Sequence, residues 1–100
     1  MNDLTGKPLS KEEIGAALAS LPGWSFERES ISREFQFGSF REAMGFIVRM
    51  AFEAESLNHH PEMTNVYSTV GITLRTHDAG NTVTDYDIQM AERLNQISWI

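Results

Sequence analysis

The stretch from Phe40 to Leu57 places the strongest constraint on the fold, because it is the longest helical pattern in the chain and is apolar over most of its circumference. Ser39 is a suitable N-cap, and Glu42 follows it at capping-box spacing. In a projection of about 100° per residue, the polar strip is narrow and contains Glu42, Arg49, Glu53 and Ser56. The expected core stripe consists of Phe40, Ala43, Met44, Ile47, Met50, Ala51 and Ala54, with Phe46, Val48 and Phe52 beyond it. Such a helix has to be covered on two sides, so we expect a sheet on one side and a partner subunit on the other.

Shorter helix and strand patterns surround this helix. A first helix is predicted after Ser10, which has Glu13 at capping-box spacing, and it ends before Pro22-Gly23. Strands are predicted at residues 24–28 and 31–37 and within 65–77, where Gly71 is expected to mark a turn or bulge between two strands. A last helix is expected from about Thr84, with Asp87 at capping-box spacing. The order α-β-β-α-β-β-α predicts one α+β domain over residues 1–100, with a four-stranded antiparallel sheet and three helices packed on one face.

The composition argues against several classes of function. Lys and Arg number 8 against 14 Asp and Glu, and the net charge of −6 repels phosphate backbones and anionic membranes, so direct nucleic-acid binding is not expected. The absence of Cys excludes disulfides, thiolate zinc sites and thiol nucleophiles. The first ten residues have neither an apolar run nor a positive cluster, and no stretch approaches membrane-spanning length. We therefore expect a soluble, cytoplasmic protein without membrane contacts.

Two of the three histidines, His59 and His60, stand side by side where the long helix has to end, because Pro61 disfavours helical geometry in the residue before it. Glu55 lies one turn before His59, and His77 is expected on the polar face at the end of the following hairpin. Taken singly, each of these residues is more often structural or solvated than catalytic. Together the imidazoles can exchange protons near neutral pH: one can protonate a departing oxygen while another removes a proton. A three-histidine metal site is the alternative, although adjacent histidines chelate one ion poorly.

The spacing of these residues resembles the signature of the pterin-4a-carbinolamine dehydratase family. The signature runs from Glu55 through His59-His60-Pro61, Tyr67 and His77 to an Asp before a helix. The segments LNHHPE, NVY, ITLRTHDAG and DIQMA are similar to the family's segments in the same order, and the resemblance covers about residues 8 to 98. It implies an enzyme that removes water from 4a-hydroxytetrahydropterins to give quinonoid dihydropterin, in tetrahydrobiopterin recycling, with no metal and no redox cofactor.

The resemblance also implies catalytic roles. His59 and His77 match the acid and the base, and Glu55 matches the carboxylate that supports the site. His60 matches a histidine that lines the pterin pocket, and Pro61 beside it is expected to contact the substrate.

Two departures from the family pattern concern the pocket. Asp87 matches the closing aspartate, which holds a site histidine or the loop, but the loop before it is one residue longer than expected, so Asp85 is an alternative. Met63 stands where many members carry Trp, and a Met packs more loosely against a flat ring.

The family assembles through its long helix or through sheet edges, so the resemblance implies a homo-oligomer, dimer or tetramer, that uses helix 40–57. The rival interpretation is a non-enzymatic binding or dimerisation module that uses the same apolar helix.

Overall fold

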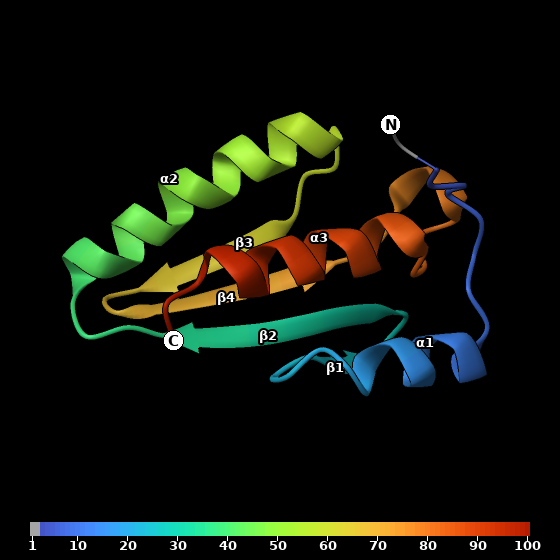
Figure 1. The fold of residues 1–100 in the computed structure, drawn as a ribbon, viewed down its shortest axis with the longest axis horizontal. Helices are drawn as coiled ribbons and strands as arrows, with labels where there is room; N and C mark the ends of the chain where they lie inside the picture. Colours follow the sequence, from blue (N-terminus) through green and yellow to red (C-terminus); the bar gives the residue numbers. More distant parts are fainter. Residues whose placement is uncertain (1–2) are drawn as a thin grey trace.

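The computed structural model describes residues 3–100 and contains the predicted elements in the predicted order (Figure 1). The helices are α1 (Lys11–Leu18), α2 (Phe40–Leu57) and α3 (Asp85–Ile97), with one 3-10 turn, η1 (His77–Ala79), before α3. The strands are β1 (Ser25–Glu27), β2 (Ser30–Gln36), β3 (Glu62–Val66) and β4 (Thr69–Leu74). The prediction of an α+β fold with a four-stranded antiparallel sheet and three helices is confirmed. No helix within residues 3–100 is long and apolar enough to cross a membrane.

The sheet has the order β1-β2-β4-β3, with all neighbours antiparallel. A two-residue turn joins β1 to β2, and both of its residues, Arg28 and Glu29, have positive φ angles of 55° and 62°. Such turns match the twist of the strands that they connect. Strands β1 and β3 are the edges, and the helices cover the face of the sheet that carries the buried side chains Val70, Ile72 and Leu74 of β4 (Figure 1).

The prediction of a turn at Gly71 is wrong. Gly71 lies inside β4, opposite Thr64 of β3, and the turn falls instead at Tyr67 and Ser68, where Tyr67 has φ 58°. A Cβ at Gly71 would stand 2.7 Å from Oγ1 of Thr64. The glycine therefore allows a close approach between the two strands, which is another common use of glycine in a strand.

The predicted core stripe of α2 is partly wrong. The buried residues are Ala43, Phe46, Met50, Ala54 and Leu57. Phe46 is completely buried, with its ring centroid 4.7 Å from that of Phe35 and 5.0 Å from that of Phe37, whereas Phe40 remains half exposed. Because α2 is apolar on nearly every side, its sequence does not fix which side meets the sheet. The packing of the Phe46 ring against Phe35 of β2 and against Phe37, the residue after β2, fixes this orientation.

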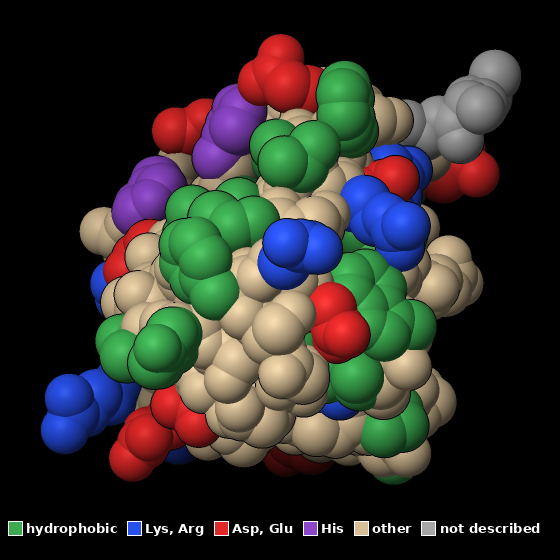
Figure 2. All heavy atoms as spheres, turned by 90° about the vertical axis from the view of Figure 1, so that its left-hand side faces the viewer, with side chains coloured by type: hydrophobic (Ala, Val, Ile, Leu, Met, Phe, Trp, Pro, Cys, Tyr) green, Lys and Arg blue, Asp and Glu red, His purple; other side chains and the backbone are tan. Residues whose placement is uncertain are grey.

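The outer face of α2 leaves apolar side chains exposed to solvent. Val48 is 56% exposed and Phe52 is 72% exposed. Figure 2 shows hydrophobic side chains in several patches, among charged ones, over the end of the molecule at the left of Figure 1. A helix with such a face is typical of a surface that packs against another protein.

Candidate active site

The end of α2 separates the two adjacent histidines. Asn58 adopts the left-handed conformation (φ 51°, ψ 45°) that ends many helices, and Asn is one of the few residues that adopt it readily. The His59 amide then donates back to the Ala54 carbonyl at 3.0 Å. The chain reverses direction here, so the His59 side chain is nearly buried, at 11% exposure, whereas His60 is 59% exposed.

His59 is fixed by a buried carboxylate. Its Nε2 lies 2.5 Å from Oδ1 of Asp87, which is completely buried at the start of α3. A carboxylate can only accept this bond, so Nε2 carries the proton and Nδ1 is the ring nitrogen left for other partners. The ring of Tyr86 lies beside the imidazole, with 5.7 Å between the centroids. The carboxylate therefore sets both the orientation and the tautomer of His59.

Asp87 is held in place by a second set of donors. Its Oδ2 accepts from the Thr84 amide and from the Thr76 hydroxyl, both at 2.9 Å, and the Thr84 hydroxyl lies 2.7 Å from that of Thr76. Thr84 and Asp87 form the predicted capping box of α3, which is thereby confirmed. The same carboxylate thus caps a helix with one oxygen and orients a histidine with the other.

Asp85, the alternative for the closing aspartate, binds elsewhere. It accepts from the Thr5 amide at 2.7 Å and from the Gly6 amide at 3.0 Å, and so attaches the N-terminal segment to the start of α3. Partial burial acts to raise the pKa of Asp85, but the hydrogen bonds from Thr5 and Gly6 outweigh it and hold the pKa below its ordinary value. In this structure it is Asp87, and not Asp85, that contacts a histidine.

The sequence predicted that His77 lies on the polar face of a strand, but the structure places it outside the strands. Strand β4 ends at Leu74, and Thr76 pairs instead with Thr82 across the following loop, so His77 begins η1. Its Nδ1 lies 2.6 Å from Oδ1 of Asn81. The amide oxygen accepts this bond, so Nδ1 carries the proton and Nε2 is left with a free lone pair.

The three histidines line one hollow of about 200 Å³, formed by the end of α2 and by residues 75–78. A second hollow, of about 550 Å³, adjoins it and shares Asn58, His59, Thr76 and Asp78 with it. Thr5 and Gly6 of the N-terminal segment form part of the wall of this second hollow. The volume of the second hollow lies within the range of about 300 to 1,000 Å³ that is usual for small-ligand sites.

The remaining residues that the sequence associated with the pocket line neither hollow. Oε1 of Glu55 lies 2.9 Å from Nε2 of His60, but the Glu55 side chain is 79% exposed and does not line either hollow. Pro61 also lies outside the two linings. Met63 is half exposed on β3 and borders a different hollow, which it shares with Gly71 and other residues of the sheet.

Sequence reasoning did not identify several residues of the site. Thr76 and Asp78, on either side of His77, line both hollows, and Asn81 holds the His77 ring. Their position beside a candidate histidine was the available signal. Nothing in the sequence pattern indicated that Thr5 and Gly6 would join the wall, because their placement depends on Asp85, about 80 residues away.

The arrangement suits proton exchange with a small molecule. Nδ1 of His59 and Nε2 of His77 have no hydrogen-bond partner among the described residues 3–100. They belong to opposite tautomers and come from separate segments of the chain. Within residues 3–100, no group of three or more His, Cys, Asp or Glu side chains is placed to hold a metal ion. The fold and this hollow together define a candidate acid–base site for a small ligand.

Comparison with known proteins gives a consistent result. The model of the family described as "Pterin 4 alpha carbinolamine dehydratase" matches residues 7–97. A relative from Opitutus terrae is 52% identical over 92% of this chain and 95% of its own length, and one from Mesorhizobium japonicum is 49% identical over the same shares. Both are named "Putative pterin-4-alpha-carbinolamine dehydratase".

A solved structure from Brucella melitensis is similar in fold as well as in sequence. It is described as a transcriptional coactivator/pterin dehydratase, and it matches with a TM-score of 0.87 and 43% identity over 91% of this chain and 98% of the other. The chain therefore belongs to the pterin 4 alpha carbinolamine dehydratase family. The resemblance that the histidine spacing indicated is confirmed.

Proposed function

We propose that this protein converts 4a-hydroxytetrahydropterin into quinonoid dihydropterin and water, with His59 and His77 as the acid and the base. The observation that carries the proposal is that the two imidazoles border one hollow, each with a nitrogen that has no hydrogen-bond partner within residues 3–100. Membership of the dehydratase family supports the reaction class. The function would serve tetrahydrobiopterin recycling.

The chemistry needs one proton delivered and one removed. Protonation of the 4a-hydroxyl lets the C4a–O bond break with loss of water, while N5 gives up its proton so that its electron pair forms the new double bond to C4a. An imidazole on each side of the ring can perform these transfers, and each typically accelerates a reaction by about 10²- to 10⁴-fold. His60 contributes to the wall, and Glu55 holds it there through their 2.9 Å contact.

The test is the dehydration of a synthetic 4a-hydroxytetrahydropterin by the wild-type protein and by His59→Ala and His77→Ala. We expect each substitution to lower turnover by about tenfold or more. His77 is exposed and does not hold the core together, so His77→Ala should melt like the wild type. Glu34→Gln, an exposed site on β2, is the control and should leave the rate unchanged. A wild-type protein that does not accelerate dehydration would refute the proposal.

The proposal includes catalysis without a metal or an organic cofactor, since the reaction needs only proton transfer. Turnover should persist after treatment with a strong chelator and dialysis. Loss of activity on chelation, followed by recovery with an added divalent ion, would favour the three-histidine metal site instead.

We further propose that the outer face of α2 mediates homo-oligomerisation, with the sheet edge as a second contact. The exposed Val48 and Phe52 support this assignment. Val66 at the end of the edge strand β3 and Tyr67 in the following turn also support it, since they are 75% and 80% exposed. Phe52→Ser should shift the mass measured by light scattering towards the monomer, whereas Phe52→Leu should not. A wild-type protein that is monomeric at all concentrations would contradict this proposal.

The same exposed face supports one alternative function, a binding or dimerisation module without enzymatic activity. The Brucella melitensis neighbour is described as a transcriptional coactivator as well as a dehydratase. An inactive wild-type protein that still forms Phe52-dependent assemblies would favour this alternative.

A further inference from the structure

Arg33 occupies an unusual position for an arginine. It lies on β2 between Ile31 and Phe35, on the face that points into the core, and it is partly buried. Its Cζ stands 4.1 Å from the centroid of the Phe35 ring. Gly23, with φ 90°, makes room for it, because a Cβ at that position would stand 2.6 Å from Nε of Arg33.

Neutral oxygen atoms hold one end of the guanidinium. Its Nη1 donates to the Pro22 carbonyl at 3.2 Å and to Oδ1 of Asn95 at 2.7 Å. Asn95 is itself fixed, because its Nδ2 donates to the same Pro22 carbonyl and its Oδ1 also accepts from Nε1 of Trp24. These contacts use both hydrogens of Nη1 and leave those of Nη2 without an acceptor among residues 3–100.

Within residues 3–100, Arg33 forms no ion pair with a carboxylate. The other partly buried arginines differ: Arg75 lies 2.9 Å from Glu62 and Arg93 lies 3.5 Å from Glu53. Glu34, the next residue, is on the opposite face of the strand. Burial lowers the pKa of Arg33, but a guanidinium keeps its charge at neutral pH. A cation without an ion-pair partner among residues 3–100 is therefore fixed in a protein with a net charge of −6.

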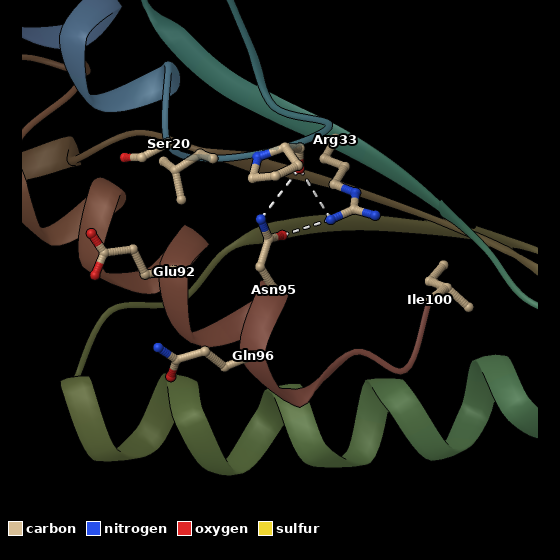
Figure 3. A pocket seen from close by; sticks show the side chains of 8 residues that line it. Ser20, Arg33, Glu92, Asn95, Gln96 and Ile100 are labelled. Carbon is tan, nitrogen blue, oxygen red and sulfur yellow. Dashed lines mark hydrogen bonds between the residues drawn. The ribbon is translucent and has the colours of Figure 1, made fainter.

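The guanidinium borders a pocket of about 500 Å³ between β2, the α1–β1 connection and the end of α3. Figure 3 shows Arg33 between Asn95 and Ile100, with one terminal nitrogen directed towards Asn95 and the other directed away from it. Leu21, Pro22 and Ile100 give the pocket an apolar wall, and the Glu92 carboxylate also lines it. None of its lining residues lines either hollow at the histidines.

We propose that this pocket is a second binding site, which takes a small organic monocarboxylate with an apolar body. The carboxylate would accept from the free Nη2 edge of Arg33, since guanidinium groups bind planar carboxylates with directed hydrogen bonds. The apolar body would lie against Leu21 and Ile100. Glu92 in the same pocket disfavours a second negative charge, so a monoanion is preferred to a phosphate dianion. The site is independent of the proposed dehydration.

The experiment follows the Nε–Hε resonance of Arg33 in the ¹⁵N-labelled, full-length protein during titration with benzoate. We expect a saturable shift with a dissociation constant on the order of 1 mM, as befits so small a ligand. Benzamide, which has the same shape without the charge, should not shift the resonance, and phenyl phosphate should bind at least about tenfold more weakly than benzoate. Linear, unsaturated shifts with benzoate, or equal shifts with benzamide, would overturn the proposal.

Two substitutions sharpen the result. Arg33→Gln should abolish benzoate binding, and benzoate binding that survives in this variant would refute the role of Arg33. Glu92→Gln lies on the pocket wall and should strengthen phenyl phosphate binding relative to benzoate; an unchanged ratio would refute the preference for a monoanion. If Arg33→Gln does not fold, the wild-type resonance of Arg33 itself still decides the question.

Discussion

Replacing Asp87 with Asn tests whether the buried carboxylate sets the tautomer of His59. At Asp87, Oδ2 accepts from the Thr84 amide, a donor that cannot be reversed. In Asp87→Asn the side-chain oxygen therefore has to stay at Thr84, and the NH₂ group has to face Nε2 of His59. An NH₂ group can only donate, so Nε2 would lose its proton and Nδ1 would gain it. The substitution is nearly isosteric, yet it moves the proton of His59 from Nε2 to Nδ1.

The structure indicates a modest cost in stability and a large cost in rate. A hydrogen bond to a charged group contributes about 1.5–3 kcal/mol, whereas domains of this size are stable by about 5–15 kcal/mol, so the variant should still fold. The other contacts of Asp87, to Thr84 and Thr76, can be kept. With its free nitrogen always protonated, neutral His59 can no longer accept a proton from the hollow. We expect turnover to fall by about 10²- to 10⁴-fold.

Two measurements separate the chemical effect from a structural one. Long-range ¹H–¹⁵N spectra distinguish the tautomers directly, and His77, held by Asn81, provides an internal reference that should not change. Stopped-flow dehydration of the pterin carbinolamine gives the rate. Glu34→Gln makes the same chemical change at an exposed carboxylate and should leave both spectrum and rate as in the wild type.

The reasoning would be refuted by an Asp87→Asn protein in which His59 keeps its proton on Nε2. It would also be refuted by a protein in which the tautomer is exchanged but turnover is unchanged, because His59 would then have no part in proton transfer.

Three further predictions concern the fold. Gly71→Ala should lower the free energy of unfolding by about 1–3 kcal/mol, because its Cβ meets Oγ1 of Thr64 at 2.7 Å; in a Thr64→Ala background the loss measured by denaturant unfolding should nearly disappear. The folded-state pKa of Asp85 lies below its ordinary value of 3.8, so its bonds to Thr5 and Gly6 stabilise fully above that value and are lost as the pH falls through the lower, folded-state pKa. Amide exchange at Thr5 and Gly6 should show this acid dependence in the wild type and lack it in Asp85→Ala. Phe46→Ala should cost about 3–5 kcal/mol and Phe40→Ala clearly less, since only Phe46 is fully buried; equal losses in thermal unfolding would contradict the observed orientation of α2.

Local signals in the sequence predicted the helix starts well. Ser10, Ser39 and Thr84 are the N-caps of the three helices, as predicted, because capping depends on residues only two or three positions apart. Gly71 was misinterpreted because a glycine within a strand pattern can mark either a turn or a close approach between two strands. Only the position of the partner strand shows which of the two applies. The orientation of α2 was misassigned for a similar reason, since it depends on Phe35 in β2 and on Phe37 just after it.

The sequence predicted the part of the candidate site whose chemistry depends on residue type alone, namely the histidines. The sequence grouped His59, His60 and His77, and all three line one hollow. The family resemblance implied that Glu55 supports the site and that Asp87 holds a site histidine or the loop, but the sequence did not indicate which histidine each carboxylate contacts. Each holds a different histidine: the exposed Glu55 contacts His60, and the buried Asp87 contacts His59. The burial of a side chain depends on the whole fold, so it cannot be predicted from the residues beside it in the sequence.

The contact between His59 and Asp87 links the C-terminal end of α2 to the N-terminal end of α3. A related protein without catalytic activity would therefore still be under selection to keep both residues, because their contact contributes to stability. His77 makes no comparable contribution to stability, because its side chain is exposed and its ring is held by Asn81. Under the proposed mechanism, loss of the histidine at position 77 in related sequences should therefore be the earlier sign of lost catalysis.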